Sequence, residues 1–389
     1  MQNNQYTNDY ARNTGNVSPQ RMSRRKRRRN NTSPLKTIGG YVLKGLAVLL
    51  TLVLVVAATL FISLKMICSD AYPAAQQMFV TTILETGQLK FLASWFLSAD
   101  EIQAIVDKNS MKEFNEEVDD GLIQIGSSGN VSVDGDAAPD TADEPIEIVE
   151  VSGSTFFGTL MIVKDPSRVS LATIYPWCDV GVTLDELVKD AGAIGGINGG
   201  LYNSSNNSGG RPYGVIVSNG EIQMNDPQSH TGLVLIGLTN DNILQIIDIA
   251  GMTPADIESL VEEKGIRDAV TFQEEASDAN NHFVQLIING EARELNGMGS
   301  GLNPRTAIGQ RADGAILMLV TDGRGKAGHL GASASDLIGV MTEYGAVNAA
   351  NLDGGSSSCM YYDNEYLMTS VTFYYSNSSW KLPAGFVVK

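Results

Sequence analysis

The chain has 389 residues, of which 43% are hydrophobic and 18% charged, enough for one large domain or two smaller ones. Its net charge of −17 is unevenly distributed: residues 1–36 carry +8 and the rest carries −25. The acidic body argues against nucleic acid as a partner. Three cysteines and three histidines show no spacing typical of a metal site or a disulfide framework.

The N-terminal part of the chain has the pattern of a membrane anchor. Six consecutive basic residues, 24–29, precede an uncharged apolar run of twenty residues, 45–64. Such a run matches a hydrocarbon core of about 30 Å. Basic residues that flank a membrane span remain on the cytoplasmic side of the membrane. We therefore predict a disordered, basic cytoplasmic tail at 1–37 and one transmembrane helix at 38–67. The protein is then a single-pass cell-membrane protein whose C-terminal part is extracellular.

Two connecting segments follow the predicted anchor. Residues 68–109 have apolar side chains at helical spacing and a capping-box pattern at Ser98–Glu101, so they predict a helical stalk. Residues 110–147 are rich in acidic residues, glycine and serine. This composition predicts a flexible, extended linker.

The remainder, 148–389, alternates strand-like and helix-like patterns. Apolar, β-branched runs predict strands at 156–163, 169–175, 213–217, 232–236, 283–288 and 315–320. Capping boxes and glycine stops predict helices at 183–192, 254–264 and 333–345. Asn219-Gly220 and Asn289-Gly290 are typical of hairpin turns. The order favours an α+β domain with a mixed β-sheet and flanking helices over a doubly wound fold.

Four glycine-rich segments combine charged, amide and hydroxyl side chains near the ends of apolar runs. They are GGINGGLYN at 195–203 (followed by RPYG at 211–214), NPRTAIG at 303–309, VTDGR at 320–324 and NLDGGSSS at 351–358. Glycine lets a backbone approach a ligand and present its N–H groups to an anion. Each segment alone is more typical of a turn than of a site. The dense clusters of charge, amide and hydroxyl groups favour a site.

Taken in this order and spacing, the segments resemble the phosphodiester glycosidase family over about residues 150–389. Three positions depart from the family pattern: Asn303 replaces a usual histidine, Leu201 an aromatic residue and Ser356 a third glycine. The resemblance implies a glycosidase that hydrolyses sugar-1-phosphodiester bonds, here in envelope or surface glycans. Its partner is then a phosphorylated or phosphodiester-linked glycan.

The resemblance and the chemistry of these side chains together imply roles. Arg305 and Arg324 would bind phosphate through their guanidinium forks, with Arg211 as a weaker third candidate. Asp353 and Asp322 would be the paired carboxylates, one at the anomeric carbon and one activating water, with Asp353 central. The remaining predicted substrate-binding residues are Asn198, Gly199, Thr306, Gly354, Gly355 and Ser356.

Several alternatives stay open from sequence. No cofactor or metal is predicted, although Asp322, Asp353 and Asn198 offer oxygen ligands for calcium or magnesium. A serine nucleophile at Ser356 or Ser357 would need a base, and His329 is interpreted instead as a surface or supporting residue. Cys178 and Cys359 either pair or stay free. The whole domain is alternatively a non-catalytic module that binds phosphorylated glycans during envelope polymer assembly.

Overall fold

The computed structural model describes residues 34–86, 89–114, 116–126, 145–276, 281–371 and 377–389. The chain divides into two units, one ending at Ile62 and one beginning at Ser63. The predicted tail at 1–33 and the linker residues 127–144 lie outside the described residues.

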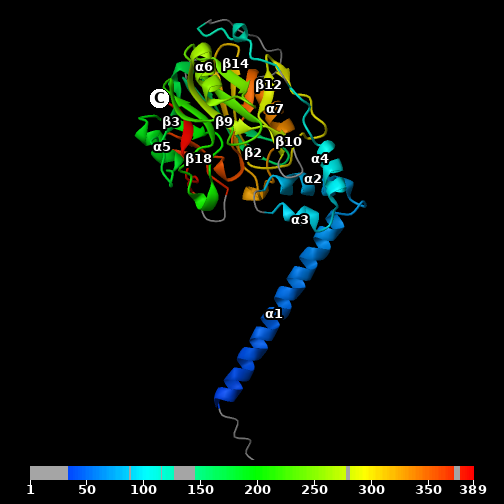
Figure 1. The fold of residues 1–389 in the computed structure, drawn as a ribbon. Coiled ribbons are helices and arrows are strands. Elements are labelled where there is room, and N and C mark those ends of the chain that lie inside the picture. Colours follow the sequence, from blue (N-terminus) through cyan, green and yellow to red (C-terminus); the bar gives the residue numbers. More distant parts are fainter. Residues whose placement is uncertain (1–33, 87–88, 115, 127–144, 277–280, 372–376) are drawn as a thin grey trace, which may run out of the picture. The chain divides into compact units, whose positions relative to one another are not determined.

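Helix α1, Pro34–Ile67, carries the predicted anchor (Figure 1). Its segment Ile38–Ile67 is long and apolar enough to cross a membrane, with a mean hydropathy of 2.8, and none of it is buried inside the protein. Leucine and valine side chains such as Leu46 and Val53 are more than half exposed. Length and composition therefore agree with the prediction of a membrane span.

Three short helices follow and enclose a small apolar cluster of their own. They are α2 (Pro73–Leu84), α3 (Phe91–Ser94) and α4 (Ala99–Asp107). Cys68, Val80, Leu84, Ala93 and Ile102 are buried together in this cluster. Helix α4 begins at the predicted capping box, because Ser98 and Glu101 exchange their side-chain and backbone hydrogen bonds. The helical character predicted for the stalk is thus present.

The described residues after α4 lie against the following domain, unlike the extended linker that their composition predicts. Met111 forms a bridge with Leu295, and Gln124 N–H donates to the Ala312 carbonyl at 2.7 Å. Phe114 and Val118 pack on the main core. Apolar side chains placed among the acidic residues explain this difference, because their burial holds the segment on the domain.

Three antiparallel sheets build the domain. The seven-stranded sheet has the order β1-β2-β15-β14-β16-β12-β13. Its strands are Ile146–Ser152, Phe157–Val163, Ile316–Thr321, Thr306–Arg311, Ala346–Asn351, Gln285–Ile288 and Glu291–Ala292, in that spatial order. The second sheet, β18-β17-β4-β19-β3, contains Glu365–Met368, Met360–Tyr362, Gly195–Asn198, Ala384–Val388 and Val169–Thr173.

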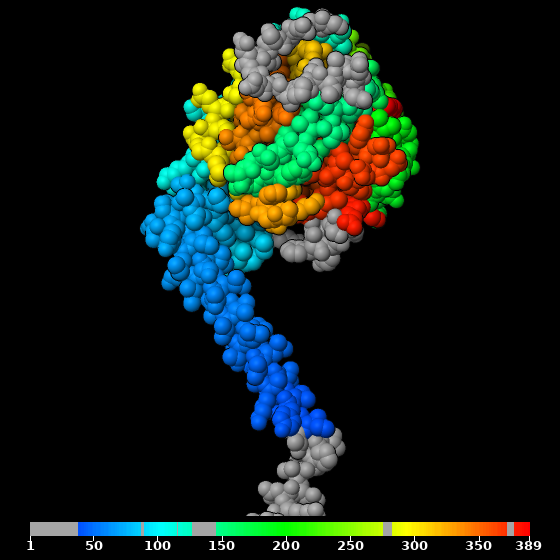
Figure 2. Space-filling model, turned by 180° about the vertical axis from the view of Figure 1, so that it is seen from behind, coloured from blue at the N-terminus to red at the C-terminus, as the bar shows by residue number. Residues whose placement is uncertain are grey.

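The third sheet, β6-β5-β9-β7-β8, contains Glu221–Asp226, Gly214–Ser218, Ile266–Gln273, Leu233–Thr239 and Leu244–Asp248. A two-stranded ribbon pairs β10, Glu275–Ala276, with β11, Asn281–His282. On the face shown in Figure 2, the β1–β2 hairpin (teal to green) runs beside the C-terminal β17–β18 hairpin (red-orange), and β2 contacts β18.

One apolar core is shared by all three sheets. Met161, Ile197 and Ile236, one from each sheet, are buried in the same cluster. Helices cover the outer faces (Figure 1): α7 (Ala334–Glu343) packs on β12 and β16, α5 (Leu184–Asp190) on β4 and β17, and α6 (Pro254–Lys264) on β6 and β9. The closed core fixes the loops at the strand ends, where the glycine-rich segments lie.

The α+β class is confirmed, and each predicted strand and helix overlaps an observed one. Both predicted hairpin turns are present, with Asn219-Gly220 joining β5 to β6 and Asn289-Gly290 joining β12 to β13. Among the described strands all pairings are antiparallel, so each sheet is antiparallel and not mixed. Hairpins such as β14–β15 are combined with crossover connections, because neighbours such as β2 and β15 are not consecutive in the chain.

Candidate active site

The four glycine-rich segments meet at one edge of the domain. Asn198 ends β4, Thr306 begins β14, Asp322 follows β15, and Asp353 comes two residues after β16. Strands β15, β14 and β16 are adjacent in the seven-stranded sheet. The second sheet joins them, because Asn198 Nδ2 donates to the Asp353 carbonyl at 2.6 Å and Thr306 Oγ1 donates to Asn198 Oδ1 at 2.7 Å.

Asp353 has a strongly perturbed carboxyl group. Burial raises its pKa to about 7, against the hydrogen bonds from the Ser357 hydroxyl and Gly354 N–H and the charge of Arg324. Ser357 Oγ lies 2.9 Å from the hydroxyl of buried Tyr202. Burial raises the pKa of Tyr202 as well, and the negative charge of Asp353 adds to the rise. A carboxyl group with this pKa exists in both protonation states near neutral pH.

Arg324 faces Asp353 from the neighbouring loop. Its Nη1 donates to Ser356 Oγ at 2.8 Å and its Nε to Asn303 Oδ1 at 3.1 Å. The residue is exposed, and partial desolvation by the neighbouring segments lowers its pKa, with the charge of Arg305 adding to the effect. A Cβ on Gly355, which has φ of +62°, would come within 2.6 Å of Arg324 Nη2. Glycine is therefore required where the guanidinium approaches.

The backbone of Arg324 is itself strained. Its φ of +54° lies in the left-handed region that favours glycine, which costs roughly 1–3 kcal/mol for other residues. Arg324 N–H donates to the Leu330 carbonyl at 3.0 Å and Gly325 N–H to the His329 carbonyl at 2.7 Å. These bonds close the loop of residues 322–331 and hold the guanidinium toward Ser356.

Arg305 is enclosed by protein and bound to a carboxylate from the stalk. Its guanidinium donates to the Glu85 carboxylate, to Ser300 Oγ at 3.1 Å and to the Gly301 carbonyl at 2.8 Å. Glu85 also accepts from Gly301 N–H at 2.5 Å and from Asn303 Nδ2 at 3.1 Å. Burial raises the pKa of Glu85, and the charge of Arg305 opposes this. Arg305 thus lies in the predicted site, but its guanidinium binds a carboxylate of the protein itself. The sequence predicted a substrate phosphate in that position.

Sequence reasoning missed Glu85, although one signal was present. Glu85 caps the C-terminus of α2, where the helix dipole disfavours a negative charge, and it directly follows apolar Ile83 and Leu84. An acidic residue in such a position needs a cation nearby. The position of that cation, 220 residues away, is set by the fold alone.

Four other predicted substrate ligands have protein partners. The Asn198 side chain is completely buried, and its Oδ1 accepts from Thr306 Oγ1 and from Cys359 N–H at 3.2 Å. Asn198 and Thr306 therefore join the two sheets beneath Asp353. Arg211 is exposed and pairs with Asp179 at 3.1 Å. Gly199 lies directly at the cluster, because its carbonyl accepts from Asp353 N–H at 3.3 Å.

Asp322 lies across β14 from Asp353 and has partners of its own. Strands are about 4.8 Å apart, so the backbones that carry the two aspartates are separated by about 10 Å. Asp322 Oδ1 accepts from Phe157 N–H at 2.8 Å, and Oδ2 lies 2.6 Å from His329 Nδ1. The carboxylate therefore leans toward β2, on the side of β15 away from β14.

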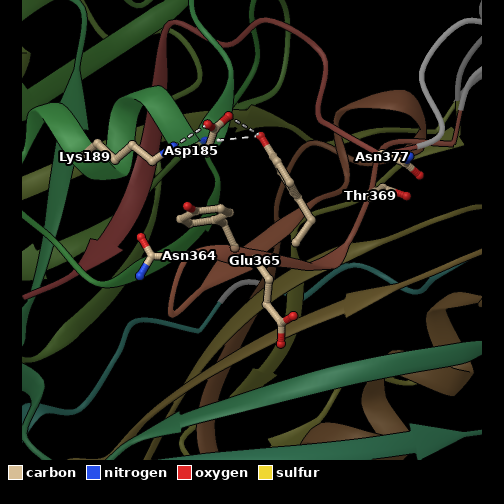
Figure 3. A pocket seen from close by; sticks show the side chains of 8 residues that line it. Asp185, Lys189, Asn364, Glu365, Thr369 and Asn377 are labelled. Carbon is tan, nitrogen blue, oxygen red and sulfur yellow. Dashed lines mark hydrogen bonds and ion pairs between the residues drawn. The ribbon is translucent and has the colours of Figure 1, made fainter.

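A polar hollow of about 390 Å³ lies between α5 and the β17–β18 hairpin (Figure 3). Asp185, Lys189 and Tyr366 hydrogen-bond to one another along its wall. Thr369, another wall residue, accepts a hydrogen bond of 2.6 Å from Lys326 Nζ in the 322–331 loop. Sequence reasoning did not predict this hollow, because its residues come from separate elements without a shared motif.

Neither the cysteines nor the acidic residues form a metal centre within the described ranges. No group of three or more His, Cys, Asp or Glu residues there is placed to hold an ion. The three cysteines are free: Cys178 is exposed, whereas Cys68 and Cys359 are buried. A Cys178–Cys359 disulfide is therefore absent, since one thiol faces solvent and the other lies in the core.

Comparison with known proteins agrees with this arrangement of motifs. The model of the phosphodiester glycosidase family matches residues 191–389, just over half of the chain. The chain belongs to the phosphodiester glycosidase family. The matched region contains all four glycine-rich segments and ends at the last residue, whereas α1 and the stalk precede it.

The individual proteins that the chain resembles are distant or match only a short segment. SPbeta prophage-derived uncharacterized protein YomE of Bacillus subtilis (strain 168) is 38% identical over 65 residues, which is 17% of this chain and 10% of that protein. The catalytic domain of zebrafish N-acetylglucosamine-1-phosphodiester alpha-N-acetylglucosaminidase is 16% identical, with coverage of 65% of this chain and 86% of that domain and a TM-score of 0.49. A hypothetical protein from Synechocystis is 18% identical, with coverage of 63% and 61% and a TM-score of 0.39.

Proposed function

We propose that this chain is a membrane-anchored glycosidase that hydrolyses sugar-1-phosphodiester bonds in envelope or surface glycans. The observation that carries the proposal is the arrangement of Asp353 and Arg324. A carboxyl group with a pKa of about 7 lies beside a guanidinium, and Ser356 and Ser357 join the two. Family membership supports the same class of reaction.

The reaction breaks the bond between the anomeric carbon and the phosphate oxygen. Arg324 would bind the phosphodiester, because two of its N–H groups match two phosphate oxygens and can exchange Ser356 and Asn303 for them. The Ser356 N–H would add a donor for the departing anion, whereas the Gly355 N–H donates to the Pro304 carbonyl at 2.8 Å. Asp353 in its protonated form would give its proton to the leaving oxygen.

Arg305 would act indirectly, without contacting the substrate. Its charge is compensated by Glu85, so it would hold the 300–305 loop in place and leave direct phosphate contact to Arg324. Asn198 and Thr306 would fix the backbone of Asp353 from below. Divalent cations are not required by this scheme, which uses only side chains present in the cluster.

The location of the activity follows from the anchor. Helix α1 would cross the cell membrane once, with the basic tail inside and the glycosidase outside. An extracellular domain would have access to envelope glycans. Sugar phosphodiester bonds in such glycans are of the type that the family name indicates. The negative charge of the residues after 36 disfavours nucleic acid as a partner.

A non-catalytic glycan-binding module is the second proposal. The observation in its favour is that Arg305, Asn198 and Thr306 all have protein partners, which leaves few side chains free to act on a substrate. Such a module would bind phosphorylated glycans through Arg324 without cleaving them.

The full chain in detergent, incubated with a synthetic sugar-1-phosphodiester, separates the two proposals. Release of free sugar at a rate that scales with enzyme concentration is the result expected for the glycosidase. Saturable binding with no sugar release would contradict it and support the module. Asp353→Asn serves as the matched control, because it changes the carboxyl group without changing its size.

A further inference from the structure

Asp322 and His329 form a hydrogen-bonded pair that the sequence interpretation did not join. Asp322 is held at its backbone and at its side chain: its N–H donates to the Phe157 carbonyl and its Oδ1 accepts from Phe157 N–H, both at 2.8 Å. Its Oδ2 lies 2.6 Å from His329 Nδ1. The Asp322 side chain is 5% exposed and that of His329 is 34% exposed. A fixed, buried carboxylate therefore orients a ring whose other edge reaches the surface.

This arrangement determines which ring nitrogen can react. A carboxylate at Nδ1 favours the tautomer with the proton on Nδ1 and leaves a lone pair on Nε2. In the part of the chain that the structure describes, Asp322 is the one side-chain partner found for the ring. Nε2 can thus accept a proton from a water molecule or a ligand.

The pair lies on the same loop as Arg324. Arg324 N–H donates to the Leu330 carbonyl and Gly325 N–H to the His329 carbonyl, so one short closed loop carries both functional side chains. Arg324 Nη1 donates to Ser356 Oγ, so this loop adjoins the segment that carries Asp353.

We propose that His329 is the general base of the reaction and that Asp322 is its positioning residue; this rests on the proposed glycosidase function. His329 Nε2 takes a proton from water while the water oxygen bonds to the anomeric carbon. The bond from that carbon to the phosphate oxygen breaks, and Asp353 gives its proton to the departing oxygen. The products are free sugar and a phosphate monoester, and solvent returns the proton from His329 to Asp353. Attack by water opposite the leaving group inverts the anomeric configuration.

The test compares three variants of the full chain in detergent, assayed for sugar release. His329→Ala should lower kcat about 10²–10⁴-fold, with recovery when imidazole is added, because free imidazole replaces the missing base. His329→Gln, whose amide can still donate to Asp322, should be equally inactive. Leu330→Ala is the matched control: this exposed neighbour takes no part in the reaction and its variant should keep the wild-type rate.

The possible outcomes separate a base from a structural residue. Full activity of His329→Gln, or activity of His329→Ala within about threefold of wild type, would overturn the inference while the glycosidase function stands. Inactivity of His329→Ala that imidazole does not restore, with a lowered unfolding temperature, would also overturn it. If the wild-type chain itself releases no sugar, the proposed function fails, and the general-base role fails with it.

Discussion

The two arginines of the candidate site have opposite surroundings. Arg305 is 6% exposed, and its guanidinium binds the Glu85 carboxylate and lies 4.8 Å from the centre of the Phe283 ring. Arg324, on an exposed loop, donates its side-chain hydrogen bonds to two neutral side chains, Ser356 and Asn303. Both come from segments with the same composition of glycine, charge and hydroxyl groups.

The difference indicates that the two arginines have different roles. A buried guanidinium with a carboxylate partner stabilises the loop around it, and its charge is largely compensated. A guanidinium with neutral partners keeps its charge available for an anion. We therefore assign phosphate binding to Arg324 and a structural role to Arg305, and the following predictions test this division from the largest expected effect to the smallest.

Replacement of the Asp353 carboxyl group, which lies beside Arg324, should have the largest effect. Asp353→Asn should lower kcat about 10²–10⁴-fold, because the amide cannot donate the proton that the carboxyl group supplies. Sugar release by the purified variant measures this, and its unfolding temperature shows whether the fold is kept. Retention of more than half of the wild-type rate in a folded variant would remove Asp353 from the mechanism.

Removal of the partner of Arg305 should act on stability. Glu85→Ala leaves a buried guanidinium uncompensated, which should lower the free energy of unfolding by about 3–5 kcal/mol. Denaturant unfolding measures the change. Glu294→Ala, which removes the exposed partner of Lys112, is the control and should leave the midpoint unchanged. An unfolding midpoint of Glu85→Ala equal to that of wild type would contradict the structural role of Arg305.

Removal of the other guanidinium should act on substrate binding. Arg324→Ala should raise KM about 10–100-fold, corresponding to the roughly 1.5–3 kcal/mol of a charged hydrogen bond. Initial rates at varied substrate concentration test this, with Arg168→Ala, a half-buried arginine outside the four segments, as control. If neither substitution changes KM, residues other than Arg324 bind the phosphate.

The pH dependence should report Asp353 directly. Its pKa is raised to about 7, so the protonated acid predominates below this pH and is lost as pH rises through it. From pH 7 to pH 8 the protonated fraction, and with it kcat, should fall about fivefold. A kcat–pH profile at saturating substrate provides the measurement. A constant kcat over this interval would contradict the role of Asp353 as proton donor.

Arg211→Ala should have the smallest effect. Its guanidinium is solvent-exposed and pairs with Asp179, also exposed, so the substitution should change KM by less than about twofold. The same kinetic assay measures it. An increase as large as that of Arg324→Ala would show that substrate draws Arg211 away from Asp179 and that phosphate has two cationic ligands.

Sequence patterns predicted the elements well because each has a local cause. Capping boxes at Ser98, Thr183 and Ser333 begin helices, and apolar runs form the strands. The four glycine-rich segments converge because each lies at a strand end of one closed fold. Local pattern thus located the site as a region.

Partners within the site depend on contacts between distant parts of the chain. Glu85 and Arg305 are 220 residues apart, and Asn198 and Asp353 are 155 apart. His329 was interpreted as a surface or supporting residue, because nothing in its local sequence shows that Asp322 holds its ring. The same limit explains why residues 111–125 looked like linker, since their apolar contacts are with strands far along the chain.

An isotope experiment tests the central claim most directly. The full chain is allowed to hydrolyse a sugar-1-phosphodiester in ¹⁸O-water, and both products are analysed by mass spectrometry. We predict ¹⁸O on the anomeric carbon of the released sugar and none in the phosphate monoester, because water attacks carbon. Label in the phosphate would show cleavage at phosphorus and would contradict a glycosidase mechanism built on Asp353 and Arg324.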